Sequence, residues 1–327
     1  MKPESVVATL NMVWRVNKRA VRLVGAPGVG KTSLVKQFAA GVGAKYVHLH
    51  VPTMLVEDFA VLNLFTEGDK FSYKLGHWWP DGEEPVVICL DDASQAGVDL
   101  QKVEANLKQE RELHGYRLPD DVMIVATGNR LEDKAGANRI LSHSADRETQ
   151  IEVEVGLQDW SKWAIDSGVP GVLVSFFQFR PDLLHDFDPQ RPRNATPRSW
   201  VEGVAPFIGE CPHGTEYEVF RGAVGEGPAG EFTAYLKIYR ELPNPDAVMM
   251  DPDGYKVPQE PATLYALSGA LAEKSSPSNL DRMVRATARM PKEFSVLAMS
   301  MATRRDPGLT STAAFTNWAV NNQDVLF

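Results

Sequence analysis

The sequence predicts an α/β fold, an αβα sandwich with a mostly parallel sheet, followed by α-helical regions. Three observations support this prediction. Short apolar runs alternate with segments of helical periodicity over the first half of the chain, a Gly/Pro-rich turn separates the first strand from the next helix, and the strand pattern fades beyond residue 156. Strands that alternate with helices usually pair in parallel, with helices on both faces of the sheet.

The first element is expected to be a helix, because Val6, Leu10 and Val13 recur at helical spacing. A helix beginning near Thr32 and another carrying Leu100 should lie between the strands. Strands are predicted wherever a short run is apolar or alternating, at 20–24, 46–51, 86–90, 122–127 and 151–155. We therefore expect residues 1–155 to form one compact domain.

Beyond Gly156 the periodicity is helical, and it predicts a helical domain over residues 156–242. A stretch rich in Pro and Asp, residues 243–261, is typical of a linker. Helical spacing returns after it, so we expect residues 243–327 to comprise this linker and a C-terminal helical extension. Expected helices in the second half of the chain lie around Trp160 and at 172–179, 197–207, 232–239, 264–274, 280–290, 294–301 and 313–320.

Composition argues against several classes of protein. A formal net charge of −9 makes a broad basic surface for nucleic acid unexpected, although a small basic lining in a ring pore is compatible with it. The longest apolar stretches are well short of the roughly 20 residues that cross a bilayer, and no signal-peptide pattern is present, so we expect a cytoplasmic protein without membrane segments. Cys89 and Cys211 provide neither a disulfide framework nor a metal site.

Residues 25–32, Gly-Ala-Pro-Gly-Val-Gly-Lys-Thr, fit the phosphate-binding loop GxxxxGK[ST] between a predicted strand and a predicted helix. Backbone N–H groups of such a loop surround a β-phosphate, Lys31 reaches the β and γ oxygens, and the Thr32 hydroxyl ligates Mg²⁺. No guanine-reading NKxD segment is present, which favours ATP over GTP. The residues predicted to bind ATP are Gly25, Ala26, Pro27, Gly28, Val29, Gly30, Lys31, Thr32 and Ser33.

Polar residues follow two further predicted strands. The strand 86–90 ends in Asp91, placed to hold Mg²⁺ through water, and Asp92, placed to orient or deprotonate the attacking water. Paired acids at a strand end could merely begin a turn, but the preceding loop favours the catalytic interpretation. Asn129 follows the next strand, and since ligands bind at the carboxyl ends of parallel strands it can reach the γ-phosphate. Asn is also a common turn former.

The order of these segments, the phosphate loop, LDDASQA (90–96), ATGNR (126–130), ADR (145–147) and TPRSW (196–200), resembles the MoxR branch of AAA+ ATPases. It is similar in particular to the stand-alone MoxR-like ATPases of phages and bacteria. The resemblance implies a Rossmann-like αβα core, a helical lid, and ATP bound at the interfaces of a homo-oligomeric ring that is usually hexameric. It also implies that Asn129 is sensor 1, Arg147 the arginine finger and Arg198 sensor 2.

Two positions depart from the family pattern. Asp92 stands where the family usually has Glu, so its carboxylate is one methylene shorter and slower hydrolysis is expected. Arg147 is followed by Glu148 rather than Phe, which leaves Arg139 as the alternative finger.

The segment 69–80 occupies the place of the helix-2 insert of MoxR proteins, a hairpin that projects toward the ring pore. Its aromatic residues Trp78 and Trp79 could grip a polypeptide or stack on bases, or could simply pack beneath the sheet edge. His48 and His50 alternate on one strand, but with no third ligand nearby in the sequence they are expected to be ordinary strand residues.

Three functions follow from these observations. The leading hypothesis is an ATP-driven remodeller of a partner protein, and the resemblance suggests a partner with a von Willebrand A domain. The alternative is a nucleic-acid-stimulated AAA+ motor of the restriction or replication type. A GTPase or small-molecule kinase is disfavoured, because no guanine-reading segment is present and Arg198 would have no role in such a protein.

Overall fold

The described residues of the computed structural model divide into two compact units. Unit 1 contains residues 1–156 and 188–190, and unit 2 contains residues 157–187 and 191–327. The structure describes residues 1–63, 72–80, 82, 84–133, 136, 138, 146–212 and 214–323.

Unit 1 is built on a five-stranded sheet in the order β2-β5-β8-β1-β9, in which all neighbouring strands are parallel. This confirms the predicted parallel αβα core. The predicted strand ends differ from the observed ones by a few residues; the last strand, for example, ends at Glu152 and not at residue 155. The strands are β1 (Val21–Val24), β2 (Lys45–His50), β5 (Val86–Asp91), β8 (Val122–Gly128) and β9 (Thr149–Glu152).

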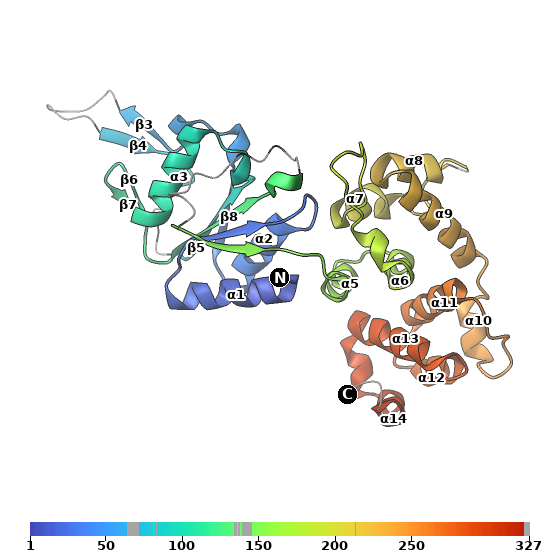
Figure 1. The fold of residues 1–327 in the computed structure, drawn as a ribbon. Helices are drawn as coiled ribbons and strands as arrows, with labels where there is room; N and C mark the ends of the chain where they lie inside the picture. Colours follow the sequence, from blue (N-terminus) through green and yellow to red (C-terminus); the bar gives the residue numbers. More distant parts are fainter. Residues whose placement is uncertain are drawn as a thin grey trace. The chain divides into compact units, whose positions relative to one another are not determined.

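Helices cover both faces of this sheet (Figure 1). On one face lie α1 (Pro3–Val16) and α2 (Lys31–Gly41), and on the other lies α3 (Val98–Glu110). Alternate residues of β5 point to opposite faces, so Val87 and Cys89 pack toward α1 and α2, whereas Ile88 and Leu90 pack toward α3. Burial on both sides explains why this strand is a continuous apolar run.

Two short antiparallel hairpins accompany the sheet. The first pairs β3 (Ala60–Asn63) with β4 (Ser72–Leu75), and the second pairs β6 (Glu112–Leu113) with β7 (Tyr116–Arg117). The Tyr73 ring stacks on the His114 ring with centroids 3.9 Å apart, and the Tyr116 hydroxyl donates to the Tyr73 carbonyl at 2.7 Å. The β3–β4 hairpin extends away from the sheet (Figure 1). Of its two strands, β4 falls within the segment 69–80 in which the resemblance implied a hairpin, and residues 64–71 lie outside the described part of the chain.

Unit 2 is helical and has an aromatic core. Trp200 is fully buried, its Nε1 donates to the Leu183 carbonyl at 2.8 Å, and its ring contacts Phe176, Phe177 and Phe232. The helices are α5 (Leu157–Asp166), α6 (Gly171–Phe179), α7 (Pro197–Gly203), α8 (Glu216–Val224), α9 (Glu226–Arg240), α10 (Pro245–Met250), α11 (Pro261–Lys274), α12 (Leu280–Thr287), α13 (Lys292–Arg305) and α14 (Ala313–Asn321).

Short 3₁₀ segments connect several of these elements. In unit 1 they are η1 (Val51–Thr53), η2 (Val56–Asp58), η3 (Ala93–Gln95) and η4 (Leu131–Asp133), and in unit 2 they are η5 (Pro181–Leu184), η6 (Ala205–Phe207) and η7 (Pro307–Ser311). The helix predicted over 197–207 therefore ends early, with η6 completing it. Within the described ranges, none of the helices combines the length and apolarity needed to cross a membrane.

The stretch predicted as a linker, residues 243–261, contains α10. Asn244 caps that helix by accepting a hydrogen bond from the Asp246 N–H at 2.9 Å, and Pro245 occupies the first turn. Val248 and Met249 are buried. Only the remainder of the stretch, rich in Pro and Asp, lacks helical structure.

Candidate nucleotide-binding site

The phosphate-loop residues 25–30 connect β1 to α2 in a conformation that depends on glycine. Gly28 and Gly30 have φ angles of 76° and 93°, and Gly30 is the residue from which α2 begins. At Gly25 a Cβ atom would lie 2.6 Å from the Val153 carbonyl oxygen, so no side chain fits there without movement. The loop therefore runs close to the chain after β9, with the first N–H groups of α2 pointing out of its end.

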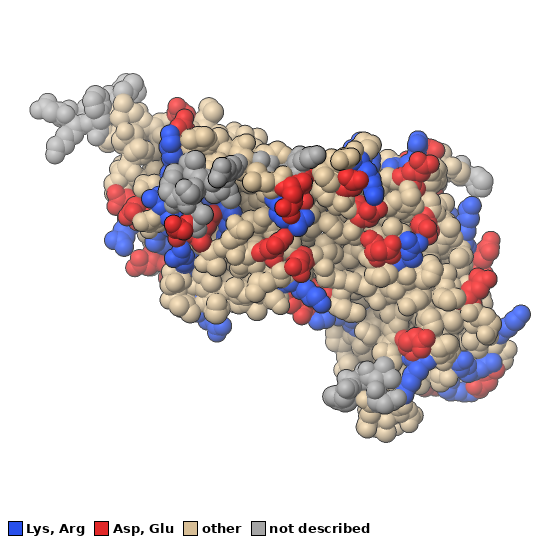
Figure 2. Space-filling view, viewed as in Figure 1, with Lys and Arg blue, Asp and Glu red and all other residues tan. Residues whose placement is uncertain are grey.

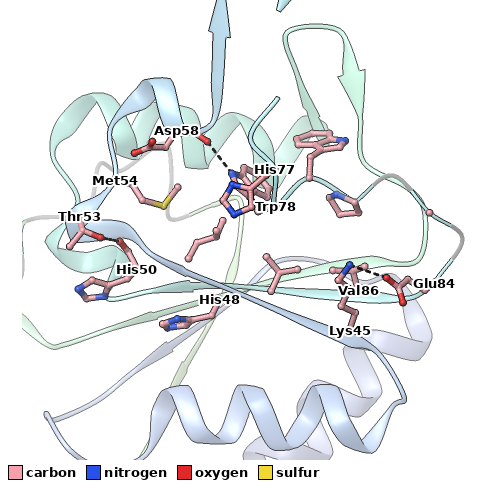
Figure 3. Close-up of a pocket in the computed structure, with 15 residues that line it drawn as sticks. Lys45, His48, His50, Thr53, Met54, Asp58, His77, Trp78, Glu84 and Val86 are labelled. Atoms are coloured by element: carbon pink, nitrogen blue, oxygen red, sulfur yellow. Dashed lines mark hydrogen bonds and ion pairs between the residues drawn. The ribbon is translucent and has the colours of Figure 1, made fainter. Parts of the chain in front are cut away.

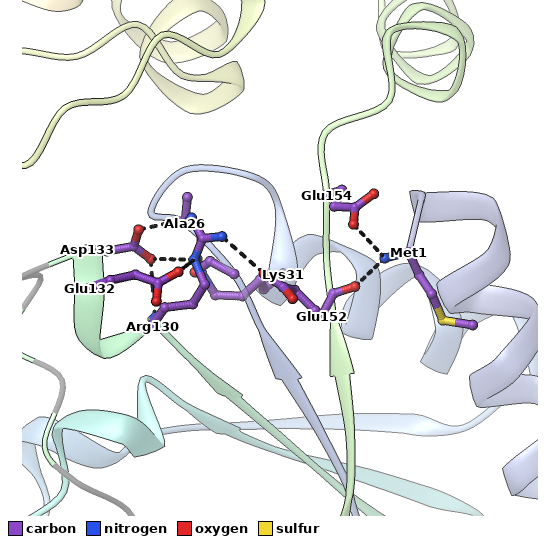
Figure 4. A network of polar contacts seen from close by, with 9 residues as sticks. Met1, Ala26, Lys31, Arg130, Glu132, Asp133, Glu152 and Glu154 are labelled. Carbon is purple, nitrogen blue, oxygen red and sulfur yellow. Dashed lines mark hydrogen bonds and ion pairs between the residues drawn. The ribbon is translucent and has the colours of Figure 1, made fainter.

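Lys31 is almost fully buried beneath this loop, with 7% of the residue exposed. Its ammonium group donates to the carbonyl oxygens of Gly25 and Ala26 and to Asn129 Oδ1, each at 2.9 Å. These three acceptors are neutral, so an anionic phosphate oxygen would be a stronger partner for the same group. Figure 4 shows Lys31 and Ala26 next to the charged residues that follow β8. Lys31 and Asn129, predicted separately, thus lie in direct contact.

Asp91, at the end of β5, accepts hydrogen bonds from three side chains. Thr32 Oγ1 and Thr127 Oγ1 each lie 2.6 Å from its Oδ1, and His48 Nε2 lies 3.0 Å from its Oδ2. Burial by itself raises the pKa of this carboxyl, but the hydrogen bonds from Thr127, Thr32 and His48 outweigh burial and hold the pKa below its ordinary value. The group is therefore ionised at neutral pH. His48, expected to be an ordinary strand residue, therefore contacts a predicted site residue.

Thr32 and Asp91 form a donor set that suits Mg²⁺. Both offer hard oxygen atoms, the Asp91 carboxylate is charged, and the two oxygens already lie 2.6 Å apart. The residues present therefore fit the predicted ion. Behind them the Cys89 thiol is fully buried, and burial raises its pKa to about 12, so it is unreactive.

Asp92 adopts the left-handed conformation, with a φ of 52°. A non-glycine residue in this region is uncommon, and such residues gather at functional sites. Its N–H donates to Thr127 Oγ1 at 3.0 Å, and it is the residue before η3. Thr127 thus holds both acids: it donates to Asp91 and accepts from the backbone of Asp92.

Asn129 is held from the same side. Its N–H donates to Ser94 Oγ at 2.9 Å, and a Cβ atom at Gly128 would lie 2.8 Å from Ser94 Cβ. Sequence reasoning did not identify Ser94 or Thr127, although both are hydroxyl residues within or beside the motifs LDDAS and ATGN. The ends of β5 and β8 are therefore joined by hydroxyl groups that orient Asp91, Asp92 and Asn129.

Arg130 links the ends of β8 and β9 and was not predicted as a site residue. Its guanidinium contacts Asp133 Oδ1 and Glu152 Oε1, each at 3.0 Å, and Glu132 Oε1 at 3.4 Å (Figure 4). The hydrogen bond with Asp133 is the main cause of a raised pKa for Arg130. This ion-paired residue fixes the chain directly after Asn129.

Arg147 is half-buried in the turn before β9, and Arg139 lies outside the described residues. The neighbouring Glu148 is buried in a cluster of four charges, defined here as the ion cluster: Arg22 of β1, Glu104 and Lys108 of α3, and Glu148. Lys108 Nζ lies 3.0 Å from a carboxylate oxygen of each Glu, and Arg22 contacts Glu148 directly. Burial alone would raise the pKa of Glu148, but Lys108 and Arg22 lower it. Glu148 in place of Phe therefore anchors the residue next to Arg147.

Arg198 belongs to unit 2, whereas Lys31, Asp91 and Asn129 belong to unit 1. It is the second residue of α7 and is exposed. Thr196 caps this helix by accepting from the Ser199 N–H at 3.2 Å.

Trp78 packs into the core of unit 1 and is not free to grip a client. Only 7% of it is exposed, and its Nε1 donates to the Asp58 carbonyl at 3.0 Å (Figure 3). Its ring meets the Phe59 ring edge-on. Trp79 is half-buried beside it. Of the two interpretations of these residues, the structure favours packing for Trp78.

Comparison with known proteins agrees with this site. Residues 21–153 match the family model described as "ATPase family associated with various cellular activities (AAA)". The chain is also 27% identical over 130 residues to "Chaperone MoxR1" of Mycobacterium tuberculosis (strain ATCC 25618 / H37Rv). That match spans 37% of this chain and 32% of the relative, about a third of the relative's length. The predicted resemblance to MoxR-like AAA+ ATPases is confirmed over the nucleotide-binding unit.

Proposed function

We propose that this chain, MoxR-like over its AAA domain, hydrolyses ATP with Mg²⁺ as a homo-oligomeric ring, usually a hexamer, and uses the energy to remodel a partner protein. The observation that carries the proposal is the hydrogen-bonded assembly of Lys31, Asn129, Asp91 and Thr32 at the carboxyl ends of β5 and β8 and around the loop after β1. In a doubly wound sheet this is the edge at which ligands bind.

Each residue of the site has a distinct part in this proposal. Lys31 exchanges its neutral acceptors for β and γ oxygens of ATP, while Thr32 and Asp91 hold Mg²⁺, which neutralises charge on those phosphates. Asp92 orients the attacking water and accepts its proton, and Asn129 contacts the γ-phosphate or that water. Arg147 would complete the site of a neighbouring subunit and Arg198 would serve as sensor 2, as the resemblance implies.

The test of nucleotide binding is Lys31→Ala, measured by fluorescent ATP binding and phosphate release. We expect ATP binding or turnover to be lost while circular dichroism is unchanged, because the charge that meets the phosphates is removed. Lys36→Ala is a matched control, since Lys36 is an exposed lysine of the same helix. Unchanged ATPase activity in Lys31→Ala would overturn the assignment of the phosphate loop.

A protein client is favoured over nucleic acid by two observations. On the face of the molecule in Figure 2, acidic and basic side chains of the described residues are interspersed, which gives no sign of a phosphate-binding surface there. The β3–β4 hairpin also exposes Val61 and Leu62, which are 43% and 44% accessible and suited to contact an apolar segment. We place this activity in the cytoplasm, where ATP is available, and name a von Willebrand A domain protein as the client class to test first.

Capture of the client tests this part of the proposal. Asp92→Asn should bind ATP without hydrolysing it, so a client held in the ATP state should co-purify with this variant from the native host. Less client should co-purify when Val61 and Leu62 are both also changed to Ser. Stimulation of the wild-type ATPase by DNA or RNA, with no co-purified protein, would favour the nucleic-acid motor instead.

A further inference from the structure

We infer that the ends of β2 and β5 form a binding site for a divalent transition-metal ion, with His50, Asp91 and Asp92 as its ligands. The inference rests on the proposed function only in that Asp91 and Asp92 are also the acids of the ATPase centre. The site itself requires no nucleotide.

The strand register brings these residues together. β2 and β5 are parallel neighbours, and His50 pairs with Asp91 as the last residue of each strand. Residues in register point to the same face of a sheet, and so does His48, two positions earlier on β2. One ring nitrogen of His50 and one carboxylate oxygen each of Asp91 and Asp92 lie within 4.8 Å of one another. Figure 3 shows His50 at the end of its strand, among the residues that line a groove beside β2.

The spacing is close to that of a bound ion. Metal–ligand bonds of about 2.0–2.2 Å place two ligand atoms of one ion at most about 4.4 Å apart. Only two ligands on opposite sides of an ion reach that separation, so ligand atoms that lie within 4.8 Å of one another must draw closer for all three to bind at once. His50 is exposed and Asp92 is half-buried, so their side chains have room to rotate toward the ion.

The donor set selects the class of ion. An imidazole with two carboxylates suits Zn²⁺, Co²⁺ or Mn²⁺, whereas Mg²⁺ prefers oxygen ligands and retains its waters. The Asp91 carboxylate is oriented by His48 from 3.0 Å, an arrangement typical of the outer shell of a metal site. His50 is thus the residue that distinguishes this site from the Mg²⁺ position between Thr32 and Asp91.

A transition-metal ion at this position would occupy both acids. Asp92 would then no longer be available to orient water, so the ion would inhibit the proposed ATPase even in excess Mg²⁺. The inference therefore predicts that this motor is sensitive to zinc through a residue outside its phosphate loop.

The experiment is a titration of the full chain with Co²⁺ in the absence of nucleotide, followed by visible d–d absorption and by calorimetry. We expect one Co²⁺ per chain, with the affinity reduced at least tenfold in His50→Ala and likewise in Asp92→Asn. His77→Ala is the matched control, because His77 is another exposed histidine of the same groove that lies outside the cluster, and its affinity should equal that of the wild type.

The outcomes separate this inference from the proposed function. Absence of Co²⁺ absorption, or equal affinity in the wild type and His50→Ala with both folded by circular dichroism, would overturn the inference while a Mg²⁺-dependent ATPase activity remained. Binding that depends on His50 in a chain that does not hydrolyse ATP would support the inference and refute the proposed function.

Discussion

Glu148→Gln in the ion cluster tests how unit 1 is held together. Glutamine keeps the shape of the side chain but removes its charge, so Arg22 and Lys108 are left with Glu104 as their remaining acidic partner. The side chains of all four residues are only 1–3% exposed, so water cannot replace the lost partner. Breaking one side of a buried ion pair costs about 3–5 kcal/mol.

The assay is unfolding in urea followed by circular dichroism at neutral pH. The transition of unit 1 is identified by its shift to higher urea when ATP and Mg²⁺ are present. We expect the free energy of unfolding to fall by about 3–5 kcal/mol, a large share of the roughly 5–15 kcal/mol typical of a domain. The control is Glu84→Gln, which breaks the exposed pair of Lys45 and Glu84 at 3.1 Å and should cost no more than about 1 kcal/mol.

The pH dependence gives a second check. The pKa of Glu148 is lowered in the folded state, so its contribution to stability is complete above its unfolded pKa, about 4.3, and is lost as the pH falls through the lower folded pKa. The difference between wild type and Glu148→Gln should therefore be full at neutral pH and shrink below about pH 4. A cost equal to that of Glu84→Gln, or a difference that grows in acid, would refute the account of the ion cluster.

Three further substitutions test the site and its surroundings. Arg147→Ala and Asp92→Asn subunits should each be nearly inactive when assayed alone. A mixture of the two should regain part of the ATPase activity, because some interfaces then pair an intact Asp92 with an intact Arg147. Co-assembled mixtures that stay inactive would exclude Arg147 as the finger. Gly25→Ala should weaken ATP binding, since its Cβ would lie 2.6 Å from a backbone oxygen, whereas Gly41→Ala, with open space around it, should bind normally in the same titration. Trp78→Ala should lower Tm through a cost of about 3–5 kcal/mol, and an unchanged Tm would contradict its burial.

The central features of the site could be predicted because local sequence determines them. The phosphate loop needs glycines with positive φ followed by Lys31 at the start of a helix. Asp91 ends a strand whose continuous run of apolar residues indicates that the strand is buried. The parallel order of the sheet follows from the alternation of strands and helices. These are short-range patterns, and the structure has them at the expected places.

Contacts between distant segments could not be predicted in the same way. Arg22 interrupts an apolar strand, and nothing near it in the sequence indicates that Glu148 and Glu104 neutralise it, 126 residues away in the case of Glu148. His48 contacts Asp91 only because β2 and β5 are neighbours in the sheet, which the order along the chain does not fix. Helix α10 was missed for a different reason, since its Asn-Pro start is a helix signal that the surrounding Pro and Asp residues conceal.

The most direct test of the central claim is Asp92→Asn, with ATP affinity and turnover measured on the same preparation. The substitution keeps the side-chain shape but removes the group that accepts the proton of the attacking water. We predict that ATP affinity is preserved while kcat falls by about a hundred-fold or more. A collapse of ATP affinity with kcat retained would make Asp92 a structural residue or a Mg²⁺ ligand and would contradict the proposed mechanism.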